Sequence, residues 1–216
     1  MRVRWLASFP KSGNTWVRIF LANLWAPEHA RPLALSQINA MPLYTDSTPE
    51  AAPQKEWIGK AHKAYNKETH GTRPAVYIMR DPVDIVPSAA DFFGVTNDRM
   101  SKEIAKDWPR HIQSWWGHIG MILRYENMPH NFHNLVQYLN IDEPDFGDVV
   151  HAIQCSSFDR LRQDEQANGF AEASDKGTLF FRHGKPGNGR EVLTDRQVAR
   201  VVNGAGELYR KVGYDG

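Results

Sequence analysis

One short segment near the start of the chain brings together residue types that bind anions. SFPKSGNTW, residues 8–16, contains a lysine, a glycine and several hydroxyl and amide side chains, and a helix is expected directly after it. A loop that ends at a helix N-terminus presents unpaired backbone N–H groups and the positive end of the helix dipole. Lys11 precedes the glycine, whereas the consensus G-x-x-x-x-G-K-(S/T) places its lysine directly before the hydroxyl residue that holds Mg²⁺. The segment therefore predicts a phosphate-like ligand in a loop that differs from the common magnesium-dependent one.

A second segment, residues 77–93, places an arginine between a predicted strand and a predicted helix. In YIMRDPVDIVPSAADFF the strand ends before Arg80, Asp81 and Pro82 form a typical helix start, and Ser88 follows on the helix. The planar guanidinium can donate two hydrogen bonds to one phosphate, so Arg80 and Ser88 suit phosphate binding. Taken alone, the segment suits a surface ion pair at a helix start equally well.

A third segment, residues 180–191, interleaves basic residues with glycines. FFRHGKPGNGRE carries Arg182, Lys185 and Arg190 among three glycines. Glycine lets the backbone approach an anion closely. Taken alone, the segment has the composition of a flexible, charged surface loop.

The elements expected around these segments alternate between strands and helices. Residues 26–54 are expected to form a long irregular excursion with one short helix, and residues 167–193 a loop. Strands are expected at 3–8, 56–61, 74–79 and 121–126, and helices at 14–25, from Asp81, at 101–118 with an interruption at Pro109, at 130–140, 145–153 and 156–165, and from Thr194. This alternation predicts an α/β fold: a single domain, residues 1–216, with a mainly parallel sheet flanked by helices.

The composition excludes several classes of function. The formal net charge of +1 favours neither nucleic acid nor an anionic membrane as a partner. No apolar run approaches the length of a membrane span. The single cysteine, Cys155, excludes an internal disulfide and suits a cytoplasmic protein. No metal is expected, since His130 and His133 have no third ligand at convincing spacing.

Together the three segments resemble the sulfotransferases that use 3′-phosphoadenosine 5′-phosphosulfate (PAPS). That family has P-K-S-G-(T/N)-T-W after its first strand, then R-(D/N)-P-x-D-x-x-x-S, and a late loop similar to R-K-G. This chain carries PKSGNTW, RDPVDIVPS and FRHG…GREVLT in the same order, with His183 where the family commonly has lysine. The resemblance implies a P-loop NTPase-like sulfotransferase architecture, with PAPS as the donor and adenosine 3′,5′-bisphosphate (PAP) as the product.

The resemblance also implies a role for each donor-binding residue. Lys11 would contact the oxygen that bridges phosphate and sulfate. Trp16 and Tyr125 would lie near the adenine, and Ser156, in CSSFDRL, would also touch the nucleotide. The residues expected around the 5′-phosphate are Ser12, Gly13, Asn14 and Thr15, and those expected around the 3′-phosphate are Arg80, Ser88, Arg182, His183 and Gly184.

The catalytic histidine of the family lies in a K-x-H motif at the end of a strand, which here matches Lys60-Ala61-His62. Sulfuryl transfer needs an acceptor hydroxyl that loses its proton, and histidine can accept one near neutral pH. We therefore expect His62 to be the general base, while Lys11 and Lys60 offset negative charge during transfer.

The acceptor is expected to be a small molecule with a hydroxyl group, and amines also suit this chemistry. Phe92 matches an aromatic residue that shapes the acceptor pocket in cytosolic members, and Phe9, Tyr44 and Trp57 are further candidates. The dimer motif of the family, K-x-x-x-T-V-x-x-x-E, does not occur in this chain, so the oligomeric state stays open.

Two other functions compete with this prediction. A P-loop kinase would use ATP and magnesium, but it would have no use for a 3′-phosphate site at Arg80, Ser88 and Arg182. A nucleotide-binding sensor that has lost catalysis would keep the loops and would not need His62.

Overall fold

The structure is a computed structural model that describes residues 3–39, 44–45, 57–141, 144–174, 178–182 and 184–214. These residues belong to two compact units. The first draws on Met1–Ser12, Leu43–Glu126 and Lys185–Gly216, and the second on Gly13–Pro42 and Asn127–Gly184. No helix in the described part of the chain is both long enough and apolar enough to span a membrane.

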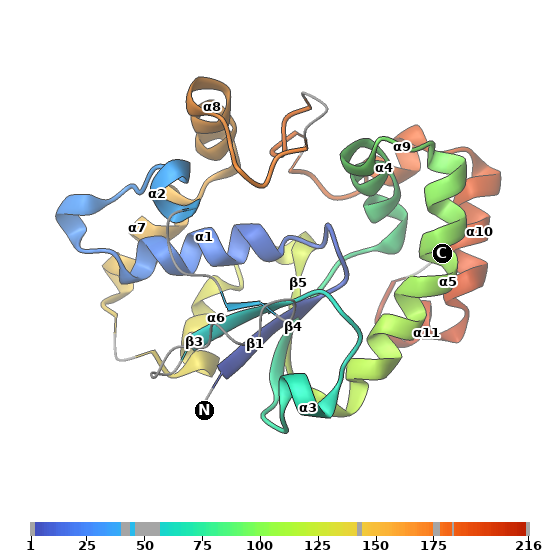
Figure 1. The fold of residues 1–216 in the computed structure, drawn as a ribbon, viewed down its shortest axis with the longest axis horizontal. Coiled ribbons are helices and arrows are strands. Elements are labelled where there is room, and N and C mark those ends of the chain that lie inside the picture. Colours follow the sequence, from blue (N-terminus) through green and yellow to red (C-terminus); the bar gives the residue numbers. More distant parts are fainter. Residues whose placement is uncertain are drawn as a thin grey trace. The chain divides into compact units, whose positions relative to one another are not determined.

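The first unit is built on a parallel sheet of five strands, in the order β2–β3–β1–β4–β5 (Figure 1). Every pairing between neighbouring strands is parallel. Strand β4, which lies between β1 and β5, is buried at every residue, which explains its continuous apolar sequence AVYIM. The strands are β1 (Val3–Ser8), β2 (Tyr44–Thr45), β3 (Trp57–Ala61), β4 (Ala75–Met79) and β5 (Ile119–Arg124).

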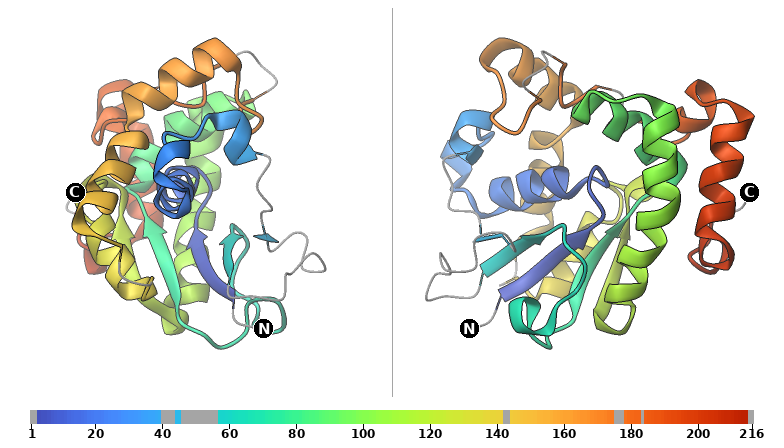
Figure 2. Two further views of the ribbon diagram at one scale, coloured as in Figure 1. Left: turned by 90° about the vertical axis from the view of Figure 1, so that its left-hand side faces the viewer. Right: turned by 45° about the vertical axis from the view of Figure 1, so that its right-hand side comes forward.

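Helices of the first unit bury a second apolar layer against the sheet. In this unit α4 packs on α5, and α10 runs along α5 (Figure 2). The shared core includes the fully buried side chains of Tyr77, Trp108, Trp115 and Tyr209. The helical elements are α3 (Lys67–His70), α4 (Pro82–Phe93), α5 (Asn97–Trp115), α9 (Asn188–Val192), α10 (Asp195–Ala205) and α11 (Glu207–Lys211), with the 3₁₀ turns η3 (Trp116–His118) and η4 (Tyr125–Asn127).

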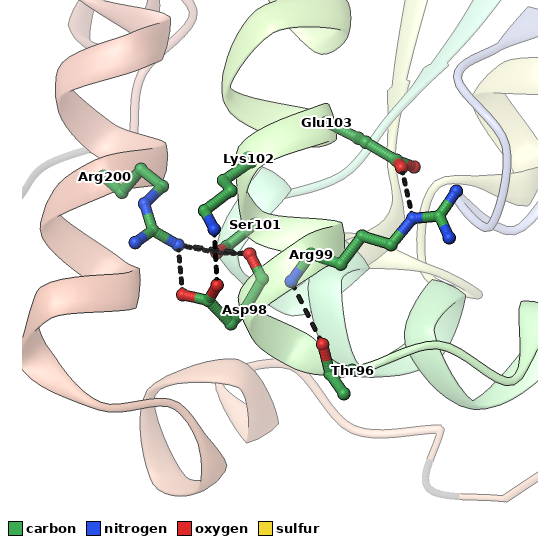
Figure 3. A network of polar contacts seen from close by, with 7 residues as sticks. All are labelled: Thr96, Asp98, Arg99, Ser101, Lys102, Glu103 and Arg200. Carbon is green, nitrogen blue, oxygen red and sulfur yellow. Dashed lines mark hydrogen bonds and ion pairs between the residues drawn. The ribbon is translucent and has the colours of Figure 1, made fainter.

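Polar contacts join the start of α5 to α10 (Figure 3). Arg200 on α10 donates to the Asp98 carboxylate at 2.8 Å and to the Ser101 hydroxyl at 2.7 Å. Hydrogen bonds from Lys102 and Arg200 lower the pKa of Asp98 to about 2. The contribution of Asp98 to stability is therefore present above the usual pKa of aspartate and is lost as pH falls toward about 2.

The described part of the second unit is helical. In this unit α1 packs against α7, α2 against α8, and α6 against α7. The rings of Phe20 and Phe132 stack with their centroids 4.2 Å apart. Arg31 donates to the carbonyls of Leu24 and Ala26, which satisfies acceptors left at the end of α1. The elements are α1 (Asn14–Trp25), η1 (Glu28–Ala30), α2 (Leu35–Asn39), α6 (Phe132–Leu139), α7 (Phe146–Cys155) and α8 (Phe158–Asn168).

The α/β class, the parallel sheet and the flanking helices expected from the sequence are confirmed. The bounds of β1 and α1 match the expected 3–8 and 14–25. The Asp81 side chain caps α4, and Thr194 forms the expected capping box with Gln197.

Four local expectations were wrong. The loop expected at 167–193 contains α9, and strand β5 lies two residues earlier than the expected 121–126. The last expected helix is divided at Gly206, whose φ of 58° ends α10, so that Tyr209 belongs to α11. Pro109 does not interrupt α5, which begins at Asn97 with Thr96 as its cap.

The helix tolerates Pro109 at a point where another helix approaches closely. Proline has no N–H, so the carbonyl of Ala105, four residues earlier, loses its usual helical donor. Gly204 of α10 lies against this carbonyl, and a Cβ at position 204 would come within 2.6 Å of both the oxygen and the Cβ of Ala105. The glycine therefore sets how closely α10 packs on α5.

We expect Gly204→Ala to lower the free energy of unfolding by about 1–2 kcal/mol. Overpacking costs about 1–3 kcal/mol, and a clash with backbone atoms of Ala105 belongs in the upper part of this range. From this cost the roughly 1 kcal/mol that alanine gains over glycine in a helix is subtracted. Gly117→Ala is the matched control, because a Cβ at Gly117 meets nothing within 4 Å. Urea denaturation of both variants checks the prediction, and equal stabilities would contradict it.

Candidate active site

The carboxyl ends of β1 and β3 bring Ser8 and His62 together in the first unit. The register pairs Ala7 with Ala61, so the next residues along the two strands are neighbours. His62 Nδ1 lies 3.0 Å from the Ser8 carbonyl oxygen and 3.1 Å from Ser8 Oγ. A carbonyl oxygen can only accept a hydrogen bond, so Nδ1 carries the hydrogen in that contact. This tautomer leaves Nε2 as the nitrogen that can accept a proton.

Lys60 lies on β3, two residues before His62. His62 directly follows Ala61, the last residue of the strand. The register places Lys60 beside Leu6 of β1. A cationic and a basic residue therefore stand two positions apart along the chain at the end of this strand.

Lys11 is held in an unusual backbone conformation just after β1. Its φ is 65°, a left-handed value that residues other than glycine seldom adopt. Arg80 donates to the Lys11 carbonyl oxygen at 3.0 Å. The Lys11 ammonium lies 4.0 Å from the centroid of the Phe92 ring on α4. Residues that follow β4 therefore contact Lys11 at two places: Arg80 binds its backbone carbonyl, and Phe92 lies against its ammonium group.

The Arg80 guanidinium is buried and lies over an aromatic ring. Arg80 is 7% exposed, and its Cζ lies 4.1 Å from the centroid of the Tyr125 ring. Burial raises the pKa of Tyr125. Neither Arg80 Nε nor the buried Ser12 Oγ has a hydrogen-bond partner among the described residues. Buried donors without an acceptor are costly, so this part of the site suits an anion.

Two carboxylates in the first turn of α4 contact residues near the end of the chain. Tyr209 donates to the Asp81 carboxylate at 3.1 Å, and Arg190 donates to Tyr209 Oη at 3.1 Å. Burial raises the pKa of Asp81, although hydrogen bonds to its carboxylate oppose this shift. Asp84 accepts the backbone N–H groups of Gly187 and Gly189, each at 2.7 Å.

In the second unit, the first turn of α1 carries the remaining residues of the anion-binding loop. Gly13 is the N-cap with a left-handed φ of 101°, and its carbonyl accepts from Val17 N. Thr15 donates to the Glu172 carboxylate at 2.9 Å, and Arg18 donates to the same carboxylate at 2.7 and 2.8 Å. Arg18 also donates to Asn14 Oδ1 at 3.2 Å.

Trp16 and Ser156 contact each other in the second unit. Trp16 Nε1 donates to the Ser156 carbonyl at 2.7 Å, and the indole packs edge-on against Phe132 and Phe158. The Ser156 hydroxyl is fully buried and donates to the Ala152 carbonyl at 2.9 Å. Their expected contacts with the nucleotide stay predictions.

The described part of the late segment in the second unit is fixed by α8. Glu165 accepts the backbone N–H groups of Phe180 and Phe181 at 2.6 and 2.9 Å. Gly184 has a φ of 64°, and a Cβ there would lie 2.5 Å from the Phe158 ring. The Arg182 carbonyl accepts from Arg162 at 3.2 Å. His183 lies outside the described residues.

The candidate acceptor residues are only partly described. Phe9 packs edge-on against His111 with the ring centroids 5.7 Å apart, and Phe92 packs against Phe93 in the same way at 5.1 Å. Tyr44 and Trp57 belong to β2 and β3, but their side chains are outside the described part of the structure. Ser88 is half-buried on α4.

The structure thus groups Lys11, Arg80, Tyr125 and Phe92 in the first unit, where His62 lies against Ser8. Sequence reasoning did not assign Asp84 a role, although it is the second aspartate of the RDPVDIVPS segment. Glu165 and Glu172 were also missed, because contacts between residues so far apart along the chain leave no spacing pattern in the sequence.

Comparison of the fold finds PAP complexes among the similar structures. Mouse sulfotransferase SULT7A1 complexed with PAP has a TM-score of 0.68 at 19% identity, and the match covers 97% of this chain and 84% of that one. Retinol dehydratase with androsterone and the inactive cofactor PAP has a TM-score of 0.68 at 14% identity, with 100% and 83% covered. Retinol dehydratase with retinol and PAP has a TM-score of 0.66 at 14% identity, with the same coverage. At these identities the likeness shows the fold.

Comparison of the sequence identifies the family. No curated protein matches the chain. The family model described as a sulfotransferase domain matches residues 3–213, nearly the whole chain. The anion-binding loop after β1, the buried Arg80 after β4 and the K-x-H motif after β3 all lie within that match. The chain therefore belongs to the sulfotransferase family.

Proposed function

We propose that the protein transfers the sulfuryl group of PAPS to a hydroxyl, or an amine, of a small organic acceptor and releases PAP. The observation that carries the proposal is the buried Arg80 guanidinium, which holds the Lys11 carbonyl and whose Nε has no acceptor among the described residues. A planar guanidinium in this setting favours a phosphate ligand, since it can donate to two oxygens.

The residues are proposed to bind two parts of the donor: the phosphosulfate at one end, and the 3′-phosphate and adenine at the other. At the sulfate end, the Lys11 ammonium would contact the oxygen that bridges sulfate and phosphate. The 5′-phosphate would accept from Ser12, Gly13, Asn14 and Thr15. At the other end, the 3′-phosphate would be bound by Arg80, Ser88, Arg182, His183 and Gly184, and the nucleotide by Trp16, Tyr125 and Ser156.

The proposed reaction is an in-line displacement at sulfur. His62 Nε2 takes the proton of the acceptor hydroxyl as the acceptor oxygen forms a bond to sulfur, and the bond from sulfur to the phosphate oxygen breaks. The Ser8 carbonyl supports this role, because it holds the hydrogen on Nδ1. Lys11 and Lys60 offset the charge that develops on the transferred group and on the leaving phosphate. We propose that these lysines do the work that Mg²⁺ does in kinases.

The acceptor class is proposed from the fold and from the aromatic candidates. Retinol dehydratase is complexed with androsterone in one structure of similar fold and with retinol in another. We propose that Phe9, Tyr44, Trp57 and Phe92 contact a small organic acceptor here. We also propose a cytoplasmic protein in which residues 1–216 form one sulfotransferase domain.

Donor binding separates the proposal from a P-loop kinase. We expect PAP to bind more tightly than ATP, with or without Mg²⁺, because a 3′-phosphate can accept from Arg80 and ATP has none. Isothermal titration calorimetry of the purified protein with each nucleotide measures this preference. Tighter binding of ATP that depends on Mg²⁺ would favour the kinase and contradict the proposal.

Substitution of the proposed base separates the enzyme from a sensor without catalysis. We expect His62→Ala to lower kcat for sulfuryl transfer by about 10²–10⁴-fold, the usual contribution of a general base, while PAP affinity is unchanged. Mass spectrometry of an acceptor panel incubated with labelled PAPS measures transfer. His133→Ala, at an exposed histidine on α6, is the control and should keep full activity. Equal activity of His62→Ala and wild type would exclude this role for His62.

A further inference from the structure

A buried carboxylate holds the backbone at each end of the late loop, a name used here for residues 180–182 and 184–187 together with Asn188 and Gly189 of the first turn of α9. Glu165 is 4% exposed and accepts the N–H groups of Phe180 and Phe181 at 2.6 and 2.9 Å within the second unit. Asp84 is 2% exposed and accepts the N–H groups of two residues at the other end, each at 2.7 Å, within the first unit. Each carboxylate thus binds two backbone groups of one loop.

These contacts are strong enough to fix a loop that its sequence leaves flexible. Hydrogen bonds to an ionised carboxylate are about twice as strong as neutral ones. Gly184, Gly187 and Gly189 lie within the loop, and glycine loses more conformational freedom on ordering than any other residue. The hydrogen bonds to the two carboxylates therefore offset the conformational entropy that the loop loses when it is ordered.

Steric fit shows that the contact with Asp84 is specific. A Cβ at Gly189 would lie 2.3 Å from the Val83 carbonyl oxygen and 2.8 Å from Asp84 N. Only glycine lets the loop come close enough to the first turn of α4 to donate to Asp84. A methyl group at position 189 should therefore break the hydrogen bonds to Asp84, as replacement of the Asp84 carboxylate by an amide should.

We propose that Asp84 and Glu165 are positioning residues that hold Arg182 and Gly184 in place to bind the 3′-phosphate of the donor. Arg182 directly follows Phe181, and Gly184 precedes Gly187 by three residues, so both lie within about 11 Å of a fixed backbone position. The inference rests on the proposed function. It predicts that the two carboxylates determine how strongly the enzyme prefers nucleotides that carry a 3′-phosphate.

Neither carboxylate is itself a ligand for the phosphate. An ionised carboxylate can only accept hydrogen bonds, and it repels a phosphate. Both carboxylates act through the backbone that they hold. Their loss should therefore weaken binding of the 3′-phosphate and leave the rest of the nucleotide unaffected.

The test compares PAP with adenosine 5′-monophosphate, which lacks the 3′-phosphate. Dissociation constants for both are measured by calorimetry with wild type, Asp84→Asn, Glu165→Gln and Gly189→Ala. Each variant should bind PAP about tenfold more weakly, the change that corresponds to one ordinary hydrogen bond, and should bind the monophosphate as wild type does. The controls are Asp91→Asn on α4 and Asp159→Asn on α8, two exposed carboxylates that should leave both constants unchanged.

Each outcome decides the inference. An equal loss of affinity for both nucleotides would mean that the carboxylates serve only the stability of the fold, and unchanged PAP affinity would show that they do not position the loop. Gly189→Ala keeps both carboxylates, so it tests the Asp84 contact if Asp84→Asn fails to fold. If wild type itself binds both nucleotides equally, the proposed 3′-phosphate site fails, and the inference fails with it.

Discussion

The hydrogen bond from Arg80 to the Lys11 carbonyl is the contact on which the first unit's part of the site depends. Lys11 follows β1, Arg80 follows β4, and Tyr125, whose ring contacts the guanidinium, follows β5. These three strands are neighbours in a parallel sheet, so their carboxyl ends open at the same edge. The left-handed backbone at Lys11 is therefore held by a side chain that follows the neighbouring strand β4.

Buried carboxylates accept hydrogen bonds from backbone N–H groups of the loops, as the carbonyls of neighbouring strands do in the sheet. Irregular segments leave N–H groups without the partners that strands and helices provide, and each such group needs an acceptor when it is buried. Asp84 and Glu165 each satisfy two of these groups in the late loop, and Asp81 caps α4 through Val83 N at 2.8 Å. The acidic residues therefore organise a site whose proposed ligand is itself an anion.

The local sequence predicted a helix or strand well where the residues that form and end it lie within it or directly beside it. The strand before the loop, the helix after it and the Asp81-Pro82 start of α4 all depend on neighbours in sequence. The uninterrupted α5 was missed because proline disfavours a helix locally, whereas the packing of α5 against α4 and α10 is tertiary structure that the local sequence does not show. Motif spacing identified Lys11, Arg80 and His62, but their contacts with Phe92, Tyr125 and Ser8 depend on tertiary structure.

The contact between Thr15 and Glu172 limits how the second unit can bind an anion. A threonine hydroxyl has one hydrogen to donate, and here it is donated to a carboxylate that Arg18 also holds. If Thr15 donates to the 5′-phosphate, as proposed, Glu172 must give up that hydrogen bond. Arg18 can keep the carboxylate charge balanced when this happens, because it makes two hydrogen bonds of its own to Glu172. The Glu172 carboxylate and the 5′-phosphate then compete for the Thr15 hydroxyl. The affinity for the donor therefore depends on how much more strongly the hydroxyl binds the phosphate than the carboxylate. Glu172, which lies far along the chain from the PKSGNTW motif, thus affects donor binding.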